Sequence, residues 1–256
     1  MRVISLNVNG IRAAAKKGLI SWLVEQQADY ICLQEVRATK AQLSALLEPL
    51  SAYTPYCIQA NKKGYSGVAI LTPHTPKAVI SDLGFKLAAT EGRYIALEMP
   101  ECIIASLYLP SGTSGEIRQQ VKYEFMDQYW PILTQQVHSK KPMVIAGDWN
   151  IAHKQIDLKN WRNNQKNSGF LPQERAWLDE LIHTLGWGDA FRLVNQEAEQ
   201  YTWWSYRGRA WDNNSGWRID YQFVNPLLQD KITKVNIYTA QRFSDHAPLI
   251  IDYAWP

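Results

Sequence analysis

The chain has 256 residues, of which 46% are hydrophobic and 20% are charged, so it can bury a large core and is not intrinsically disordered. No apolar run approaches the 18 residues of a membrane helix, and the N-terminus enters a strand pattern at once, which argues against a signal peptide. The three cysteines are isolated, with no CxxC or histidine-rich spacing, which argues against a zinc site and favours a reduced, cytoplasmic protein.

In the first half of the chain, short apolar runs alternate with short helical patterns. The sequence predicts strands at residues 3–8, 30–33, 56–59, 67–71, 93–99 and 102–107, and helices at 18–27 and 40–47. Pro100 separates the last two strands and favours a hairpin there.

In the second half, an apolar residue recurs every four positions from Val121 to Val137, which predicts a helix over 116–138 packed on a sheet. Pro131 removes one backbone donor and is expected to kink or split this helix. A strand then leads to a polar loop at 153–170, a helix at 172–185, and strands at 201–204, 217–224 and 248–253.

These elements predict an α/β fold. Strands and helices interleave, but the tight strand–strand connections argue against a purely parallel sheet. A core of two sheets flanked by helices fits better. No internal repeat or Pro/Gly/Ser-rich linker is present, so we expect a single domain over residues 1–256.

The stretch MVIAGDWN at Met143–Asn150 predicts a buried strand that ends on two polar side chains. In an extended chain Asp148 and Asn150 point the same way, about 7 Å apart, so both side chains would face one small group. The alternative is a strand that simply ends in an Asx turn.

Six junctions between an apolar strand and a polar segment carry side chains capable of catalysis, and none carries a Ser or Cys nucleophile. Four carboxylates brought together are costly unless a cation lies among them, and without a thiol or His cluster that cation should be hard, such as Mg²⁺. A metal, a spare carboxylate and a His near an Asp predict a phosphoester-hydrolysing site. The absence of a GxxxxGK[ST] loop argues against an NTPase. The junctions lie at Asn7/Asn9, Glu35, Tyr108, Asp148/Asn150, Asp220 and Asp245/His246.

Basic residues cluster in loops that also carry Gly, Asn and aromatic residues, which favours a polyanionic partner. These clusters lie at 16–17, 62–63, 154–166 and 207–209.

Eight short segments, spread over residues 1 to about 253 and in family order, resemble the exonuclease III family of abasic-site endonucleases, within the endonuclease/exonuclease/phosphatase superfamily. They are LNVNGIRA (6–13), LQE (33–35), GYSGVAI (64–70), EGRYI (91–95), YLP (108–110), GDWNIAH (147–153), GWRIDY (216–221) and SDHAP (244–248).

The resemblance implies a four-layer α/β sandwich with two mixed, mainly antiparallel sheets. It implies Mg²⁺- or Mn²⁺-dependent hydrolysis of the DNA backbone 5′ to an abasic site, leaving a 3′-hydroxyl, together with 3′-phosphodiesterase, 3′-phosphatase and 3′–5′ exonuclease activities. The expected partner is double-stranded DNA with abasic sites or blocked 3′ ends. No membrane partner is expected, and the chain is expected to be a monomer.

The resemblance also assigns residues to roles. Asp148 would activate water with Asn150 beside it, Asp220 would orient a phosphate-binding His246, and Tyr108 would assist at the phosphate. The metal site would comprise Glu35, Asn7, Asn9 and Asp245. DNA contacts would come from Arg12, Lys16, Tyr65, Arg93, Asn164, Asn167 and Arg207, and the pocket for a base-free sugar would comprise Trp203, Trp217, Ile219 and Gly169.

Other interpretations use the same residues. Taken singly, Tyr108 is typical of a packed strand-end tyrosine, and Asp220 of half a buried ion pair with Arg218. The chain could also be a specialised 3′–5′ exonuclease or 3′-phosphatase that does not cut internal abasic sites. A superfamily member acting on phospholipid head groups and a catalytically silent DNA-binding module are further alternatives.

Overall fold

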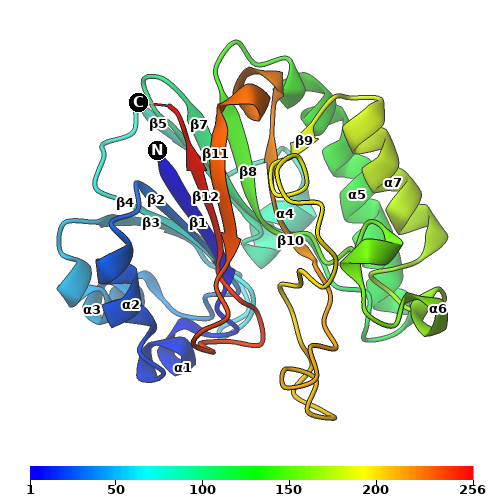
Figure 1. Ribbon diagram of the computed structural model, residues 1–256. Helices are drawn as coiled ribbons and strands as arrows, with labels where there is room; N and C mark the ends of the chain where they lie inside the picture. Colours follow the sequence, from blue (N-terminus) through cyan, green and yellow to red (C-terminus); the bar gives the residue numbers. More distant parts are fainter. Residues whose placement is uncertain (256) are drawn as a thin grey trace.

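The computed structural model describes residues 1–255, and these residues form two six-stranded sheets packed face to face, with helices on both outer sides (Figure 1). This confirms the two-sheet core that the sequence patterns predict and the four-layer α/β sandwich that the family resemblance implies. Among the same residues, no helix is both long and apolar enough to cross a bilayer.

The first sheet has one parallel pair, β1 with β2, and its other strand pairs are antiparallel. A parallel pair needs a crossover, which α1 (Ile11–Lys16) and α2 (Leu19–Gln26) provide. Both helices cover the outer face together with α3 (Lys40–Leu46) (Figure 1). In spatial order the strands are β11 (Ile232–Ile237), β12 (Leu249–Tyr253), β1 (Arg2–Asn7), β2 (Tyr30–Gln34), β4 (Val68–Thr72) and β3 (Thr54–Ile58).

The second sheet repeats this plan, with β7 and β8 as its parallel pair and α5 (Glu116–Val137) as the crossover. Helices α4 (Lys86–Glu91), α5 and α7 (Pro172–His183) contribute to the hydrophobic cluster on its outer face. In spatial order the strands are β5 (Ala78–Ile80), β6 (Tyr94–Glu98), β7 (Ile103–Tyr108), β8 (Met143–Asp148), β10 (Asp220–Val224) and β9 (Gly188–Asp189).

Three hydrophobic clusters hold the four layers together. The middle one lies between the sheets and includes Val3, Ile104 and Val144, all fully buried. The strands alternate, so Ile4 and Ile145 point to the opposite faces, where the two outer clusters pack against the helices. The central strands are thus buried on both faces, which explains their continuous apolar runs.

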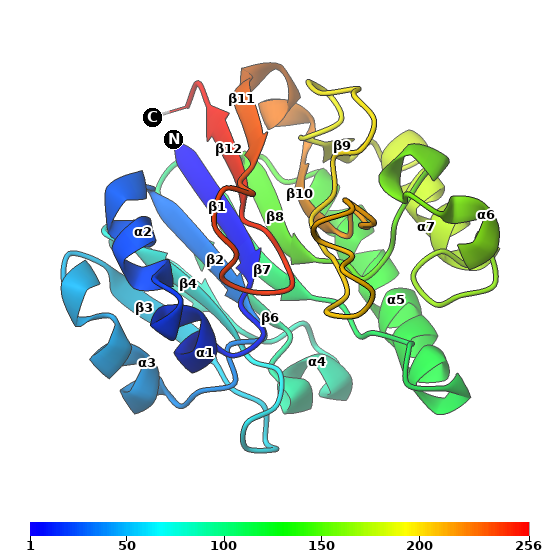
Figure 2. The same ribbon diagram turned by 60° about the horizontal axis from the view of Figure 1, so that its bottom comes forward.

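The topology gathers the polar strand ends at one edge of the sandwich. Strands β1, β2, β7 and β8 all end there, and β10 and β12, which run antiparallel to β8 and β1, begin there. Figure 2 turns this edge toward the viewer. The chain termini lie at the opposite end, where the Met1 amino group donates a hydrogen bond to the Tyr253 carbonyl (2.9 Å).

Two predicted elements differ from the structure. Residues 201–204 form no strand, because Trp203 makes only isolated bridges to Trp217 and His246. Helix α5 continues through Pro131 as one helix, so of the two predicted outcomes, a kink or a split, the split is wrong. Pro131 and Asp127, whose carbonyl would lose its helical partner, are both exposed, and water can satisfy that carbonyl.

The sequence patterns did not predict α1, α4 and the strands β5, β9 and β11. The polar loop at 153–170 contains two short helical segments, a 3₁₀ turn at Gln155–Asp157 and α6 (Trp161–Asn164). Further 3₁₀ turns lie at Glu48–Leu50 and Pro226–Lys231.

Candidate active site

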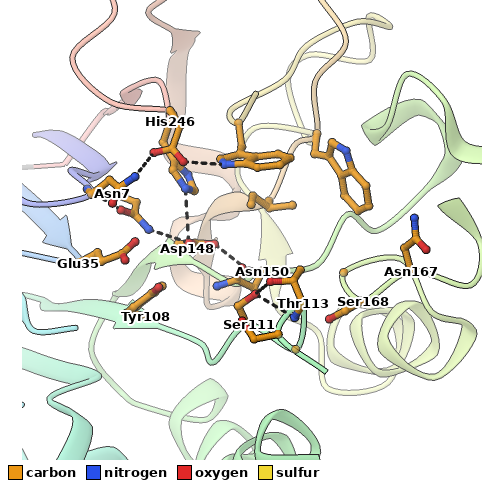
Figure 3. A pocket seen from close by; sticks show the side chains of 18 of the residues that line it. Asn7, Glu35, Tyr108, Ser111, Thr113, Asp148, Asn150, Asn167, Ser168 and His246 are labelled. Carbon is orange, nitrogen blue, oxygen red and sulfur yellow. Dashed lines mark hydrogen bonds and ion pairs between the residues drawn. The ribbon is translucent and has the colours of Figure 1, made fainter. Parts of the chain in front are cut away.

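A pocket of about 710 Å³ opens at the edge where the strand ends gather (Figure 3). All six predicted strand–polar junctions reach this edge, and five of them line the pocket directly. Asp220 lies just behind, bonded to His246. The other walls come from the loops after β7 and β8 and from the segments around Trp203 and Trp217.

Asp148, His246 and Asp220 form a buried acid–imidazole–acid group. His246 Nδ1 lies 2.9 Å from Asp220 Oδ2, and His246 Nε2 lies 3.8 Å from Asp148 Oδ2. Burial alone would lower the pKa of His246, but the two carboxylates outweigh it and raise that pKa above its ordinary value. This arrangement favours an imidazolium that faces the pocket.

Asp148 is held in place from two directions. Asn7 Nδ2 donates to its Oδ2 (2.9 Å), and the backbone N–H of Asn150 donates to its Oδ1 (2.9 Å). Burial and the neighbouring Asp220 raise the pKa of Asp148 above the usual carboxyl range, while His246 and the hydrogen bonds lower it. A raised pKa makes Asp148 a stronger base than an ordinary carboxylate.

Asn150 does not extend beside Asp148 as the strand pattern predicted. Its φ is +53°, so the chain turns left-handed directly after β8, and its side-chain amide donates to the Leu109 carbonyl (2.8 Å). The Asn150 N–H bond to Asp148 is an Asx turn, the alternative weighed for this stretch. Asn9 makes the same turn on Asn7. Because this Asx turn holds the Asp148 carboxylate in place, the functional interpretation of the strand end and the Asx-turn interpretation are compatible.

Glu35 and Asp245 supply two more carboxylates. Glu35 has a φ of +54°, which ends β2 abruptly, and its carboxylate pairs with Arg37. Asp245 accepts hydrogen bonds from Asn9 Nδ2 (2.9 Å) and from the Trp203 indole (3.1 Å). Although burial opposes the change, His246 and these donors lower the pKa of Asp245, so it is ionised at neutral pH.

Tyr108 lines the pocket opposite His246 (Figure 3). Burial and the charges of Glu35 and Asp148 raise the pKa of Tyr108 well above its ordinary value, so the phenol keeps its proton and can donate it in a hydrogen bond. The Arg93 guanidinium stacks over the Tyr108 ring at 4.7 Å.

Arg93 does not have the exposed position that its predicted DNA contact requires. Its side chain is buried, donates to the Tyr108 carbonyl and the Tyr65 hydroxyl, and pairs with Glu91. These bonds commit the guanidinium to the protein. The structure therefore shows Arg93 bonded to Tyr108, Tyr65 and Glu91, and its DNA contact stays a prediction.

An apolar wall stands beside the acidic group. Trp203 and Trp217 meet edge to face, with centroids 6.2 Å apart, and Ile219 and Gly169 complete the wall. Gly169 has a φ of +91°, and a Cβ there would lie 3.1 Å from the Asn150 carbonyl oxygen and 3.3 Å from the Trp217 ring. The structure thus brings all four predicted pocket residues together.

Among the remaining predicted DNA contacts, only Asn167 lines this pocket. Arg12, Lys16 and Arg207 are exposed. Asn164 is half-buried and accepts a hydrogen bond from Asn167 Nδ2 (2.7 Å), so the two amides form one unit. Tyr65 is bonded to both Arg93 and Arg118.

The donor set fits a hard divalent cation. The ligand atoms of Asp148, Asp220 and His246 lie within 4.8 Å of one another, so this cluster could hold an ion. His246 uses Nδ1 to bond Asp220, and the other donors of this cluster are carboxylate oxygens, which suit Mg²⁺ or Mn²⁺. One of them, Asp220 Oδ1, is buried with no hydrogen-bond partner among residues 1–255.

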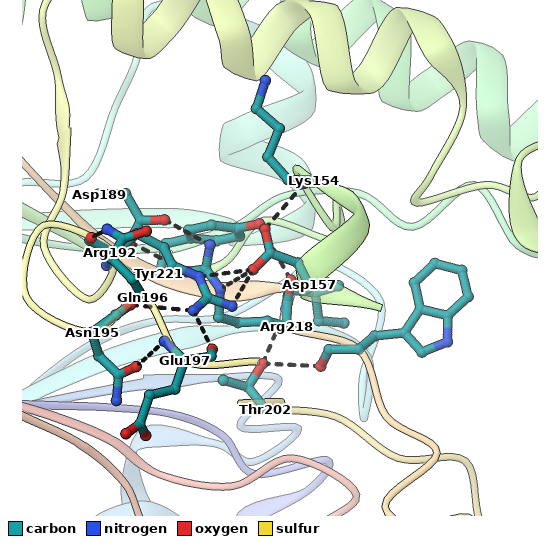
Figure 4. A network of polar contacts seen from close by, with 12 residues as sticks. Lys154, Asp157, Asp189, Arg192, Asn195, Gln196, Glu197, Thr202, Arg218 and Tyr221 are labelled. Atoms are coloured by element: carbon teal, nitrogen blue, oxygen red, sulfur yellow. Dashed lines mark hydrogen bonds and ion pairs between the residues drawn. The ribbon is translucent and has the colours of Figure 1, made fainter. Parts of the chain in front are cut away.

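A second buried network secures the back of the site (Figure 4). Arg218 does not pair with Asp220, as one interpretation of the sequence had it, but with Asp157 (2.7 Å) and Asp189 (2.7 Å). Arg192 also reaches Asp157 (2.8 Å). This network ties the loop at 153–170 to the segment that carries Trp217 and Ile219. The sequence patterns did not identify Asp157, whose one distinctive feature is that it is the only acidic residue in a basic loop.

We expect Asp157→Asn to lower the free energy of unfolding by about 2–4 kcal/mol at pH 7. Burial would raise the pKa of Asp157, but Arg218 and Arg192 outweigh it and lower that pKa to about 2. The folded-state pKa lies below the unfolded value of about 3.9, so this stabilisation is complete above about pH 5 and is lost progressively as the pH falls through about 2. Urea unfolding of both proteins from pH 7 to 2 measures the difference.

Asp230→Asn is the matched control, because Asp230 is 72% exposed and pairs only with its neighbour Lys231. Its effect should stay below about 0.5 kcal/mol. An Asp157→Asn effect as small as that of the control would show that the network does not stabilise the fold.

Comparison with known proteins agrees with this geometry. The model of the Endonuclease/Exonuclease/phosphatase family matches residues 4–246. An exodeoxyribonuclease from Bacillus subtilis is 38% identical, covering 97% of this chain and 98% of that protein. A DNA-(apurinic or apyrimidinic site) endonuclease from Dictyostelium discoideum is 33% identical, covering 97% and 69%. The solved 3′ phosphatase NExo from Neisseria, bound to a product DNA hairpin, superposes with a TM-score of 0.89 at 24% identity, covering both chains fully.

Proposed function

Because this chain belongs to the endonuclease/exonuclease/phosphatase family and is a nuclease-type hydrolase, we propose that it is a DNA-repair endonuclease that cuts the phosphodiester 5′ to an abasic site in duplex DNA. The product would carry a 3′-hydroxyl, and the same site would remove blocked 3′ ends. The observation that carries this proposal is the apolar wall of Trp203, Trp217 and Ile219 directly beside the Asp148–His246–Asp220 group.

The side chains have distinct roles in this reaction. Asp148 takes a proton from the attacking water, for which its hydrogen bonds from Asn7 and Asn150 fix the carboxylate. His246, charged and held by Asp220, stabilises the negative charge that gathers on the phosphate in the transition state. Tyr108 donates its phenolic hydrogen bond to a phosphate or leaving-group oxygen.

Glu35 is our choice for the main metal ligand. Its carboxylate lines the pocket, and its ion-pair partner Arg37 is partly exposed, so a bound ion could share or displace that partner. Asp245 also lines the pocket and accepts a hydrogen bond from the Asn9 side chain, while the Asn9 backbone N–H donates to the Asn7 side chain. Asn9 therefore orients Asp245, and Asn7 orients Asp148. A bound divalent ion would polarise the scissile phosphate and offset the charge of the four carboxylates.

The apolar wall explains why the substrate should lack a base. A flipped-out sugar without its base fits against Trp203, Trp217 and Ile219, whereas a normal nucleotide is too large once flipped. The exposed residues Arg12, Lys16 and Arg207, with Asn164 and Asn167 beside the pocket, would contact the phosphates of double-stranded DNA.

We expect Gly169→His to reduce incision of a tetrahydrofuran site by about 10²-fold, because a side chain would project against Trp217 from a backbone that favours glycine. Removal of a 3′-phosphate should persist, since no sugar occupies the pocket in that reaction. Gly186→Ala is a control with a comparable φ of +90° and open space at its Cβ. Unchanged incision by Gly169→His would remove Gly169 from the pocket.

The main alternative is a specialised 3′–5′ exonuclease or 3′-phosphatase with the same catalytic residues. The Neisseria structure resembles this chain in fold, so fold alone cannot decide between the two. The deciding experiment compares initial rates on two duplexes that differ only in the lesion, an internal abasic site or a 3′-phosphate at a nick. We expect both to be processed. Processing of the 3′-phosphate alone would establish the alternative.

A further inference from the structure

A buried ion pair outside the catalytic group connects the end of the catalytic strand to the apolar wall. Lys122 on α5 and Glu174 on α7 are both fully buried, with Nζ and Oε1 2.5 Å apart. None of the catalytic roles above uses either residue.

The contacts of this pair are directed at two particular backbone positions. Lys122 Nζ donates to the carbonyl of Asn150 (2.8 Å), the second residue after Asp148. Glu174 Oε2 accepts the backbone N–H of Gly169 (2.7 Å) and of Leu171 (3.0 Å). The pair therefore bonds both Gly169 and Asn150 at a close contact, where a Cβ at residue 169 would lie 3.1 Å from that same Asn150 carbonyl oxygen.

A buried ion pair packs two helices less favourably than an apolar pair of similar volume, because both charges must be removed from water. Here both charges bond backbone groups that an apolar pair would leave without partners. Gln119 on α5 adds a fourth bond to the Glu174 carboxylate (3.1 Å). The arrangement fixes a local geometry in addition to joining α5 to α7.

We propose that Lys122 and Glu174 are positioning residues that set the distance between Gly169 and Asn150, and through it the fit of a base-free sugar in the pocket. This inference rests on the proposed function, since the pocket matters only for a substrate with a sugar beyond the scissile phosphate. A 3′-phosphate has no such sugar. The pair should therefore affect abasic-site incision and leave 3′-phosphate removal unchanged.

The test uses the full chain with two substitutions, Glu174→Gln and Lys122→Met, separately and combined. Initial rates are measured on the abasic duplex and on the matching 3′-phosphate duplex. Amide hydrogen exchange at Gly169 and Leu171 gives a readout that needs no activity. The combined variant leaves no lone buried charge, so it keeps the test informative if a single substitution destabilises the fold. Lys141→Met is the matched control, because it breaks a partly exposed ion pair with Glu98.

For Glu174→Gln and for the combined variant we expect kcat/KM on the abasic duplex to fall by about 10–100-fold. We expect 3′-phosphate removal to stay within about threefold and the Gly169 amide to exchange at least about tenfold faster. The combined variant should recover thermal stability relative to Lys122→Met without recovering abasic-site incision. Lys141→Met should change neither rate.

Two results would overturn the inference. Equal losses on both duplexes would mean that the pair supports the catalytic group or the fold at large. An unchanged ratio of rates with unchanged exchange at Gly169 would mean that the pair does not position the wall. If the wild-type protein itself leaves the abasic duplex intact, the proposed function fails, and the exchange measurement alone still decides whether the pair holds Gly169.

Discussion

Asp148→Asn is expected to lower kcat on an abasic duplex by about 10²–10⁴-fold, the usual cost of losing a general base. The amide is close to the carboxylate in size but cannot take the proton of an attacking water at neutral pH. Because the amide keeps the size of the carboxylate and one of its two acceptor oxygens, the substitution should leave the fold and most of the DNA affinity intact. Single-turnover rates and fluorescence anisotropy with labelled abasic DNA separate the two effects.

Asp127→Asn is a suitable control, since Asp127 is exposed on α5 and is not among the residues that line the pocket. It should match the wild type in both measurements. A loss of less than about tenfold for Asp148→Asn would exclude the role of general base for Asp148.

Asp220→Asn is expected to cost about 10²–10³-fold in kcat, in the range seen when one preorganised donor is removed from a transition state. Asp220 faces His246 at 2.9 Å and is itself absent from the pocket lining, so it acts through the imidazole. Without its carboxylate, the imidazole loses both its orientation and much of its positive charge.

A double-mutant cycle tests that route. If Asp220 works only through His246, the combined Asp220→Asn and His246→Asn variant should be no slower than His246→Asn alone. Additive losses would mean that Asp220 contributes independently, for example through its unpartnered Oδ1.

The apolar strand runs predicted the two-sheet core well, because central strands buried on both faces leave a strong pattern in the sequence. Strands at the edges of the sheets have a weaker sequence pattern. Strand β5 is exposed along its whole length, and β9 has only two residues, so burial imposes no alternation on either. The aromatic run at 201–204 has the apolar pattern of a buried strand. Tyr201 and Trp204 are indeed buried, but they pack in a small separate cluster outside both sheets.

The residue types at the active site could be predicted, but their local geometry could not. Strand ends with acids, amides and a histidine indicated a hydrolytic site, and the topology brings them together. The left-handed turns at Asn9, Glu35 and Asn150 change the direction of each side chain, and a period-two pattern carries no information about such turns.

Buried charges were the hardest feature to predict. Lys122 and Glu174 have the sequence appearance of solvated helix residues, because the burial of each charge depends on a partner distant in sequence. Arg93 has the appearance of a phosphate contact, although its ion-pair partner Glu91 is only two residues away. Lys122 and Glu174 are 52 residues apart, and Asp157 and Arg218 are 61 apart. Only the folded arrangement reveals these pairs.

The central claim is that the converging strand ends form one acidic pocket that needs a divalent cation to cut DNA at an abasic site. A time course on an internally labelled abasic duplex tests it most directly, with Mg²⁺, with EDTA, and with EDTA followed by excess Mg²⁺. We predict a single cut 5′ to the lesion that ends in a 3′-hydroxyl, is lost with EDTA and returns with Mg²⁺. An intact duplex in Mg²⁺, or cutting that persists undiminished in EDTA, would contradict the account.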